Sequence, residues 1–255
     1  MSHLTNILYS AFVIPSFKSL LILCSIFMYG MDLDAQYWVQ KAGGVTIDEA
    51  ADIALDNDGN SYTVGYFTGT ATFGSTSLTA EGSTDIFLVK TNDQGVVQWA
   101  VSAGGTSSDK GLSIAVDNSG TSHITGFFNG TATFDTTSVT SVGLQDVFVA
   151  KYDANGNLDW VKSLGGTNSD IGNGIAIDWS GNVAVTGEFS GLASFGGTNL
   201  TSLSSTTDAF IVKLSSAGTV TWVKKGPGNR LDRGVEIACD QSGSNYPCPL
   251  YTSYP

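Results

Sequence analysis

The chain has 255 residues, a formal net charge of −12, 31 glycines and only 13% charged residues. Its 11 basic residues are scattered and form no basic patch, which argues against a nucleic-acid partner. Serine, threonine, glycine, asparagine and aspartate are frequent, and no segment shows sustained helical periodicity. We therefore expect an all-β protein of short strands joined by turns.

Residues 1–35 have the pattern of a secretory signal peptide. Lys18 precedes the apolar run 20–28, and a polar stretch follows that ends at the small residue Ala35. The apolar run is shorter than the about 20 residues that a membrane-spanning helix needs, so we expect no membrane span. We expect cleavage after Ala35 and a secreted or surface-displayed protein.

A tandem repeat of about 61 residues occupies most of the remaining chain. One tryptophan recurs at spacings of 61, 61 and 62 residues, and an aspartate and a glycine recur in step with it. The recurring tryptophans are Trp38, Trp99, Trp160 and Trp222. The recurring turn residues are Asp56, Asp117 and Asp178, followed three positions later by Gly59, Gly120 and Gly181.

Each unit is predicted to contain four antiparallel strands and a hairpin-like excursion before the third strand. In the second unit the strands are 111–116, 121–128, 146–151 and 157–163. Four-stranded units in tandem are typical of β-propeller blades. We expect a propeller array over 36–245, with complete blades at 37–98, 99–159 and 160–221 and a partial blade at 222–245.

Three short motifs in these units resemble the bacterial β-propeller repeat called SBBP. They are Gly-Gly-Thr-x-x-Asp-x-Gly before Ile-Ala-Val-Asp, then Gly-Thr-Ala-Thr-Phe, then Asp-x-Phe-x-Val/Ala-Lys. They lie at Gly104–Asp117 and Gly165–Asp178, at Gly69–Phe73 and Gly130–Phe134, and at Asp85–Lys90, Asp146–Lys151 and Asp208–Lys213. The resemblance covers 37 to about 245. It implies a propeller fold in a bacterial surface or secreted protein and implies no activity.

The last ten residues depart from the repeat. Pro247 and Pro249 stand where a strand is expected, and a proline cannot donate to a strand ladder. We interpret 246–255 as an artefactual end on a truncated gene, with a natural tail as the alternative. A partial blade leaves open faces, so we expect further blades or domains in the full-length chain and association of the isolated chain.

The recurring turns have a structural and a metal-binding interpretation. The first aspartate of each turn is expected to accept hydrogen bonds from turn N–H groups, while the glycine supplies a positive φ. The segment 56–60 also resembles the opening of an EF-hand loop, which makes calcium the alternative. No glutamate follows at loop position twelve, so we favour the structural interpretation and expect no cofactor.

Two other recurring sets of side chains have similar alternatives. The aspartates that precede the first strand of each blade could form a cation-binding ring, but we expect them to cap turns. These aspartates are Asp48, Asp109 and Asp170. The recurring tryptophans could form a sugar-stacking surface, but we expect them to fill the space between blades.

Nothing in the sequence predicts catalysis. His3 and His123 are the only histidines, and no pattern of a catalytic triad or a zinc site is present. We therefore expect a non-catalytic extracellular module for binding, adhesion or scaffolding, with an unknown protein or carbohydrate partner. The alternatives are a carbohydrate-binding propeller used on polysaccharides, to which Trp179 in a turn points, or the accessory part of a larger secreted enzyme.

Overall fold

The computed structural model describes residues 42–202, 206–226, 231–239 and 247–248, which all belong to one compact unit spanning 39–255. Every regular element in these residues is a β-strand, and the strands form antiparallel sheets. The predicted all-β fold of four-stranded blades is thereby confirmed. Among the described residues, no helix is long and apolar enough to cross a membrane. The predicted signal peptide and Trp38 lie outside the described residues.

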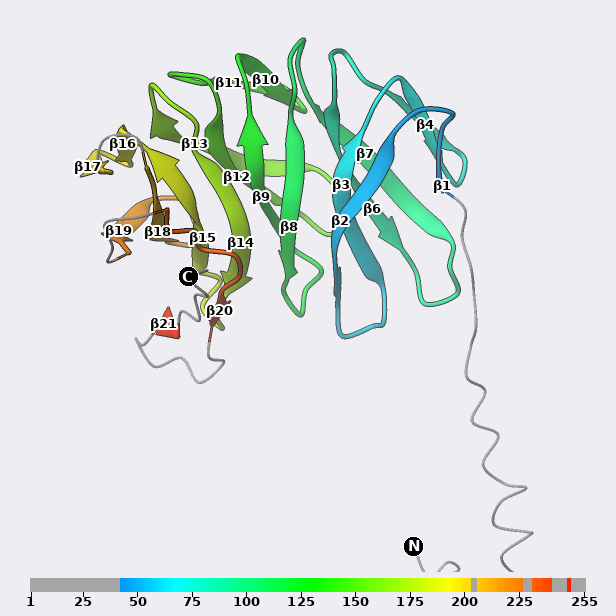
Figure 1. Cartoon of the computed structure of the whole chain (residues 1–255). Helices are drawn as coiled ribbons and strands as arrows, with labels where there is room; N and C mark the ends of the chain where they lie inside the picture. The colour runs from blue at the N-terminus through cyan, green and yellow to red at the C-terminus, as the bar shows by residue number, and fades with distance from the viewer. Residues whose placement is uncertain (1–41, 203–205, 227–230, 240–246, 249–255) are drawn as a thin grey trace, which may run out of the picture. The chain divides into compact units, whose positions relative to one another are not determined.

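Three sets of four antiparallel strands stand side by side along the chain, and hairpins of the following repeats extend the first two into six-stranded sheets (Figure 1). The first contains β2 (Asp48–Leu55), β3 (Ser61–Phe67), β6 (Asp85–Thr91) and β7 (Val97–Gly104). The second contains β8 (Lys110–Val116), β9 (Ser122–Phe128), β12 (Asp146–Tyr152) and β13 (Leu158–Gly166). The third contains β14 (Ile171–Ile177), β15 (Val183–Ser190), β18 (Thr207–Leu214) and β19 (Val220–Lys225).

A short hairpin in each repeat joins neighbouring blades. The hairpin of the second repeat, β10 (Thr131–Phe134) and β11 (Thr137–Thr140), pairs with the end of β7 in the first blade. The third repeat does the same with β16 (Leu192–Phe195) and β17 (Thr198–Thr201), which pair with β13. In the first repeat, β4 (Thr70–Phe73) and β5 (Thr76–Thr79) pair with β1 (Ala42–Gly43). The second and third hairpins therefore extend the sheet of the preceding blade, and the first forms a separate three-stranded sheet with β1.

The sheets are out of phase with the blade limits expected from the sequence. The limit between 98 and 99 cuts through β7, and the limit between 159 and 160 cuts through β13. In the structure Lys90 pairs with Trp99, and Lys151 pairs with Trp160, so each tryptophan strand is the fourth strand of its own blade. A repeat period fixes the length of a unit but not its starting point, which here is set by strand pairing.

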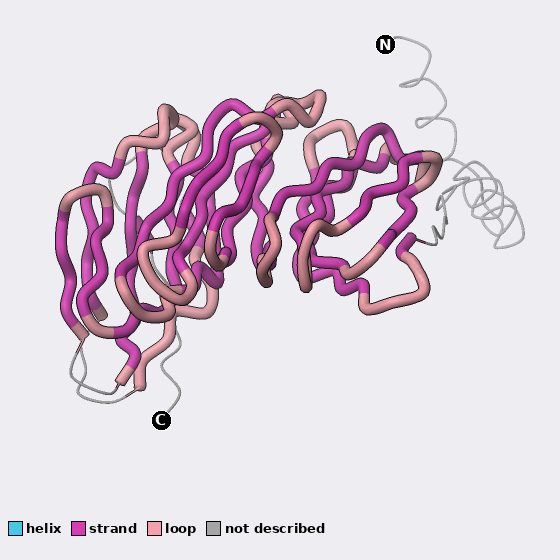
Figure 2. The backbone as a smooth tube through the Cα atoms, turned by 90° about the horizontal axis from the view of Figure 1, so that it is seen from above, coloured by secondary structure: helices cyan, strands magenta, loops and turns pink. Residues whose placement is uncertain are grey.

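The hydrophobic core lies mainly between adjacent blades. The largest cluster combines Tyr62 and Val64 of the first blade with Ile114 and Phe148 of the second. Viewed from above, the strands of successive sheets run side by side with their faces toward each other (Figure 2). Burial of facing apolar side chains between sheets is therefore the main stabilising contact of this repeat.

The start of a fourth blade covers the third. Ile237 is buried in a cluster with Ala184 and Ile211, and Asn173 donates to the carbonyl of Gly234 at 2.9 Å. The two residues of β21 (Pro247–Cys248) pair with β20 (Ala238–Cys239). Pro247 opens this two-residue strand, a position at which proline is tolerated. Asp240 and 249–255 lie outside the described residues.

Candidate functional site

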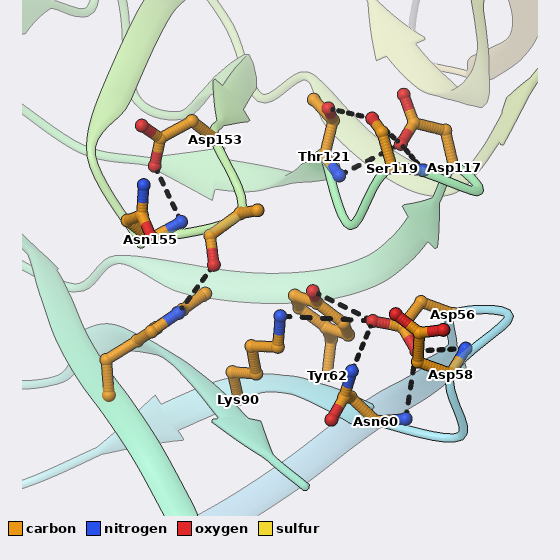
Figure 3. Close-up of polar contacts among 12 residues, drawn as sticks. Asp56, Asp58, Asn60, Tyr62, Lys90, Asp117, Ser119, Thr121, Asp153 and Asn155 are labelled. Atoms are coloured by element: carbon orange, nitrogen blue, oxygen red, sulfur yellow. Dashed lines mark hydrogen bonds and ion pairs between the residues drawn. The ribbon is translucent and has the colours of Figure 1, made fainter.

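The recurring turn aspartates organise the β-hairpins that join the first two strands of each blade. Asp56 Oδ1 accepts hydrogen bonds from the N–H groups of Asp58 and Asn60, and Oδ2 accepts from the Asn60 amide and the Tyr62 hydroxyl (Figure 3). Burial raises the pKa of Asp56, but these hydrogen bonds outweigh burial and hold the pKa below its usual value. Lys90 lies 3.9 Å from the same carboxylate. The carboxylate is therefore an ionised part of the turn.

The second and third turns repeat this arrangement. Asp117 accepts from the N–H groups of Ser119 and Thr121, and Asp178 accepts from those of Ser180 and Asn182, all at 2.9 Å. The glycines that close the turns have φ values of 79°, 78° and 73°, a region that side chains rarely adopt. They are Gly59, Gly120 and Gly181. The described residues hold no group of three or more histidine, cysteine or acidic side chains arranged for a metal ion.

The aspartates considered for a cation-binding ring bond to backbone N–H groups instead. Asp109 is fully buried, and it accepts from the N–H of Gly105 at 2.8 Å and from that of Asn129 at 2.9 Å. These bonds tie the start of the second blade to the end of β9. Asp170 is fully buried and makes the same bonds to Gly166 and Ser190. Asp48 is partly buried and accepts from Gly44 at 2.6 Å.

Asp109 and Asp170 each have a second buried acid beside them, which the sequence did not reveal. Asp146 is fully buried, and a Cβ placed on Gly165 would come within 2.8 Å of both Asp146 and Asp170. Burial raises the pKa of Asp170 to about 6, and the neighbouring Asp146 adds to this rise. Asp109 has a pKa raised to about 6 for the same reasons, with Asp85 as its neighbour.

The recurring tryptophans connect adjacent blades. Trp99 is partly buried, and its Nε1 donates to the carbonyl of Ala154 in the outer turn of the second blade at 3.0 Å. Trp160 is also partly buried and donates to the carbonyl of Ser216 at 3.2 Å. Trp222 is partly buried against the cluster that contains Ile237. None of the three presents an open aromatic face comparable to that of Trp179.

Trp179 lies beside a pocket between the turns of the second and third blades. The pocket has a volume of about 260 Å³. Trp179 is 62% exposed, and it is the only aromatic residue among the large hydrophobic side chains that are exposed in the described part of the chain. The other lining residues are Val116, Asp117, Asn118, Ser119, Ile177, Asp178 and Gly181.

The pocket combines an apolar wall with hydrogen-bonding groups. The hydrogen bonds that Asp117 receives from Ser119 and from the N–H of Thr121 go to Oδ1, and among the described residues these bonds leave Oδ2 as an acceptor. Asn118 is exposed and adds a side-chain amide. Asp178 is instead paired with Lys213 at 3.0 Å. Such a mixture of one aromatic face and a few polar groups is typical of small-ligand sites.

Sequence reasoning singled out Trp179 but did not find its neighbours in the pocket. The repeat could have indicated these neighbours. Asn118 occupies the position one period before Trp179, and stacked blades bring equivalent turns side by side. Trp179 therefore lines a pocket together with the turn of the preceding blade.

Four-stranded antiparallel sheets, repeated along the chain and packed face to face, define a β-propeller-type repeat protein. In an alignment that covers 63% of its length, the chain is 30% identical to an uncharacterised WD repeat-containing protein of Acanthamoeba polyphaga mimivirus. Over 107 residues, or 41% of its length, it is 35% identical to the regulatory protein FlaEY of Caulobacter vibrioides. These matches span only 14% and 11% of the two curated relatives. No protein-family model matches the chain.

Proposed function

We propose that the chain is a non-catalytic binding or scaffolding segment of a secreted or surface-displayed β-propeller of the SBBP type. One observation carries this proposal: the polar side chains that recur in each blade are used within the fold. The turn aspartates bond to their own turns, and Asp109 and Asp170 bond to backbone N–H groups between strands. A catalytic group would need to stay available for a substrate.

The relatives support a repeat scaffold with a binding role. One of them is described as a WD repeat-containing protein, and repeat arrays of this kind offer extended surfaces for partners. Secretion is supported by the signal-like pattern of 1–35. The proposal includes the absence of a resident metal, since the turn carboxylates already accept hydrogen bonds from the protein.

Two measurements test the proposal. In the first, residues 1–35 are fused to an alkaline phosphatase reporter that is active only after export, and we expect activity that is lost when Lys18 and the run 20–28 are deleted. In the second, the chain is incubated with soluble and insoluble polysaccharides, and we expect no release of reducing ends. Release that increases with time and protein amount would establish an enzyme and overturn the non-catalytic role.

A carbohydrate ligand is the second candidate, and the exposed Trp179 favours it over a purely structural role. The indole lines a pocket together with polar groups of the preceding turn, and such a combination suits a small-ligand site. An accessory role beside an enzyme on the same polypeptide is compatible with the same site. This alternative predicts binding without turnover by the chain itself.

A further inference from the structure

We propose that the pocket beside Trp179 binds a neutral carbohydrate chain, with one sugar ring stacked on the indole. This inference rests on the binding role proposed above and names its ligand class. It arises from three features of the pocket: an unusual side chain at a repeated position, the polar groups around it, and the local balance of charge.

The first feature is that Trp179 breaks the pattern of its turn. The same position is Asn57 in the first blade and Asn118 in the second. The turn geometry does not require tryptophan, since the backbone hydrogen bonds and the positive φ of the closing glycine are the same in all three turns. The indole is 62% exposed and is therefore not needed to fill the core. A large aromatic side chain held in this way is suited to contact with a ligand.

The second feature is the set of polar groups that the preceding turn places against the pocket. The Oδ2 atom of Asp117 is an available acceptor, and the side-chain amide of Asn118 can both donate and accept. Ser119 contributes a hydroxyl, although its Oγ also donates to Asp117 at 2.6 Å. A pyranose ring has an apolar C–H face and an equatorial rim of hydroxyls. Its face fits the indole, and its hydroxyls fit a carboxylate and an amide.

The third feature is the local charge, which favours a neutral ligand over an anionic one. Asp178 is neutralised by Lys213 at 3.0 Å, so Asp117 is the one uncompensated carboxylate of the lining. Phosphate and sulfate groups would be repelled by it. A cationic group would be attracted by Trp179 and Asp117, and a cationic probe therefore belongs in the test. A neutral oligosaccharide uses the carboxylate as a hydrogen-bond acceptor and needs no opposite charge.

Isothermal titration of the full chain with oligosaccharides tests this assignment. The probes are the hexasaccharides of cellulose, chitin and xylan, and a lysine hexapeptide serves as the cationic probe. The key variant is Trp179→Asn, which restores the side chain found in the other two turns and preserves the hydrogen bonds of the turn. The matched control is Asn57→Ala, which changes the equivalent position of the first blade. Asp117→Asn retains the Oδ1 acceptor of the turn and removes the free carboxylate oxygen.

We expect at least one hexasaccharide to bind, with affinity at least tenfold weaker in Trp179→Asn, several-fold weaker in Asp117→Asn and unchanged in Asn57→Ala. The affinity should be the same at 20 and 500 mM NaCl, because no ion pair is formed. The inference is overturned if none of the three sugars binds, or if Trp179→Asn binds as the parent does. Binding of the lysine peptide alone, lost at high salt, would instead assign a cationic ligand. None of these failures would show turnover or block export, so the broader proposal would stand separately.

Discussion

Replacing His123 with tyrosine should make the free energy of unfolding less sensitive to acidic pH. His123 is 1% exposed, and neither ring nitrogen has a hydrogen-bond partner among the described residues. Its ring lies 5.9 Å from that of Trp160. In the first blade, Tyr62 occupies the same position at 5.9 Å from Trp99. The equivalent site of the first blade therefore already accommodates a tyrosine.

The magnitude follows from the lowered pKa of His123. The pKa falls from 6.5 to about 4: burial is the largest cause, Lys151 adds to the decrease, and Asp117 and Asp159 oppose it. The folded state thus stays unprotonated while the unfolded state binds a proton below pH 6.5, so stability is lost as the pH falls from 6.5 to about 4. One pKa unit corresponds to about 1.4 kcal/mol, and a shift of about 2.5 units to about 3 kcal/mol.

Urea unfolding followed by tryptophan fluorescence at pH 7.5, 6, 5 and 4 measures this effect. The free energy of unfolding of His123→Tyr minus that of the parent should increase by about 3 kcal/mol between pH 7.5 and pH 4. The buried aspartates titrate in both proteins, so their contribution cancels in the difference. A difference that stays constant with pH would refute the reasoning. The reasoning would also be refuted if the imidazole signal of His123, assigned by its absence from His123→Tyr, titrates near pH 6.5 in the parent.

Four further outcomes are expected. Trp160→Ala should lower the free energy of unfolding by about 2–4 kcal/mol in urea titrations, because the change removes inter-blade packing and a hydrogen bond, and a loss below about 1 kcal/mol would contradict it. The raised pKa values of Asp109 and Asp170 mean that the folded state binds protons before the unfolded state does. In the His123→Tyr background, the free energy of unfolding should therefore increase by about 2–3 kcal/mol for each of these aspartates as pH falls from 6 to 4. EDTA should leave the thermal midpoint unchanged; a decrease would indicate a bound metal. Ile53 in the first blade is 60% exposed, whereas its equivalents Ile114, Ile175 and Ile237 are 5%, 6% and 6% exposed, so the first blade has an open apolar face. Light scattering should therefore show association of the chain that decreases in Ile53→Ser. A monomeric parent would contradict the open face.

Local chemistry made the strands and turns predictable. The turns that begin with Asp56, Asp117 and Asp178 each combine an acceptor side chain with a glycine that can adopt positive φ, and both features depend only on nearby residues. The strands that follow are buried on both faces and are rich in β-branched and aromatic residues, which favour strands. Repetition then strengthened each assignment, since the same local pattern recurs at a constant spacing.

Long-range pairing was not predictable from the same information. Asp85 and Asp109 are 24 residues apart, and nothing in their surroundings shows that both carboxylates are buried together. The pairing of β10 with β7 likewise joins two repeats, and it depends on how far the hairpin reaches across the preceding blade. The sequence indicated the four strands of the second unit, but the blade limits taken from the tryptophan spacing fall within β7 and β13.

The turn position held by Asn57, Asn118 and Trp179 shows where such a repeat can acquire specificity. The neighbouring aspartate and glycine are constrained by hydrogen bonds and by positive φ, and the strands are constrained by packing against two neighbours. The position between them is constrained by neither, because its side chain projects from the turn and its backbone conformation suits ordinary residues. Substitution there should change stability by no more than about 0.5 kcal/mol. A new side chain at this position can therefore create a binding surface against the adjacent turn while the blade remains intact, and Trp179 is the instance that this chain contains.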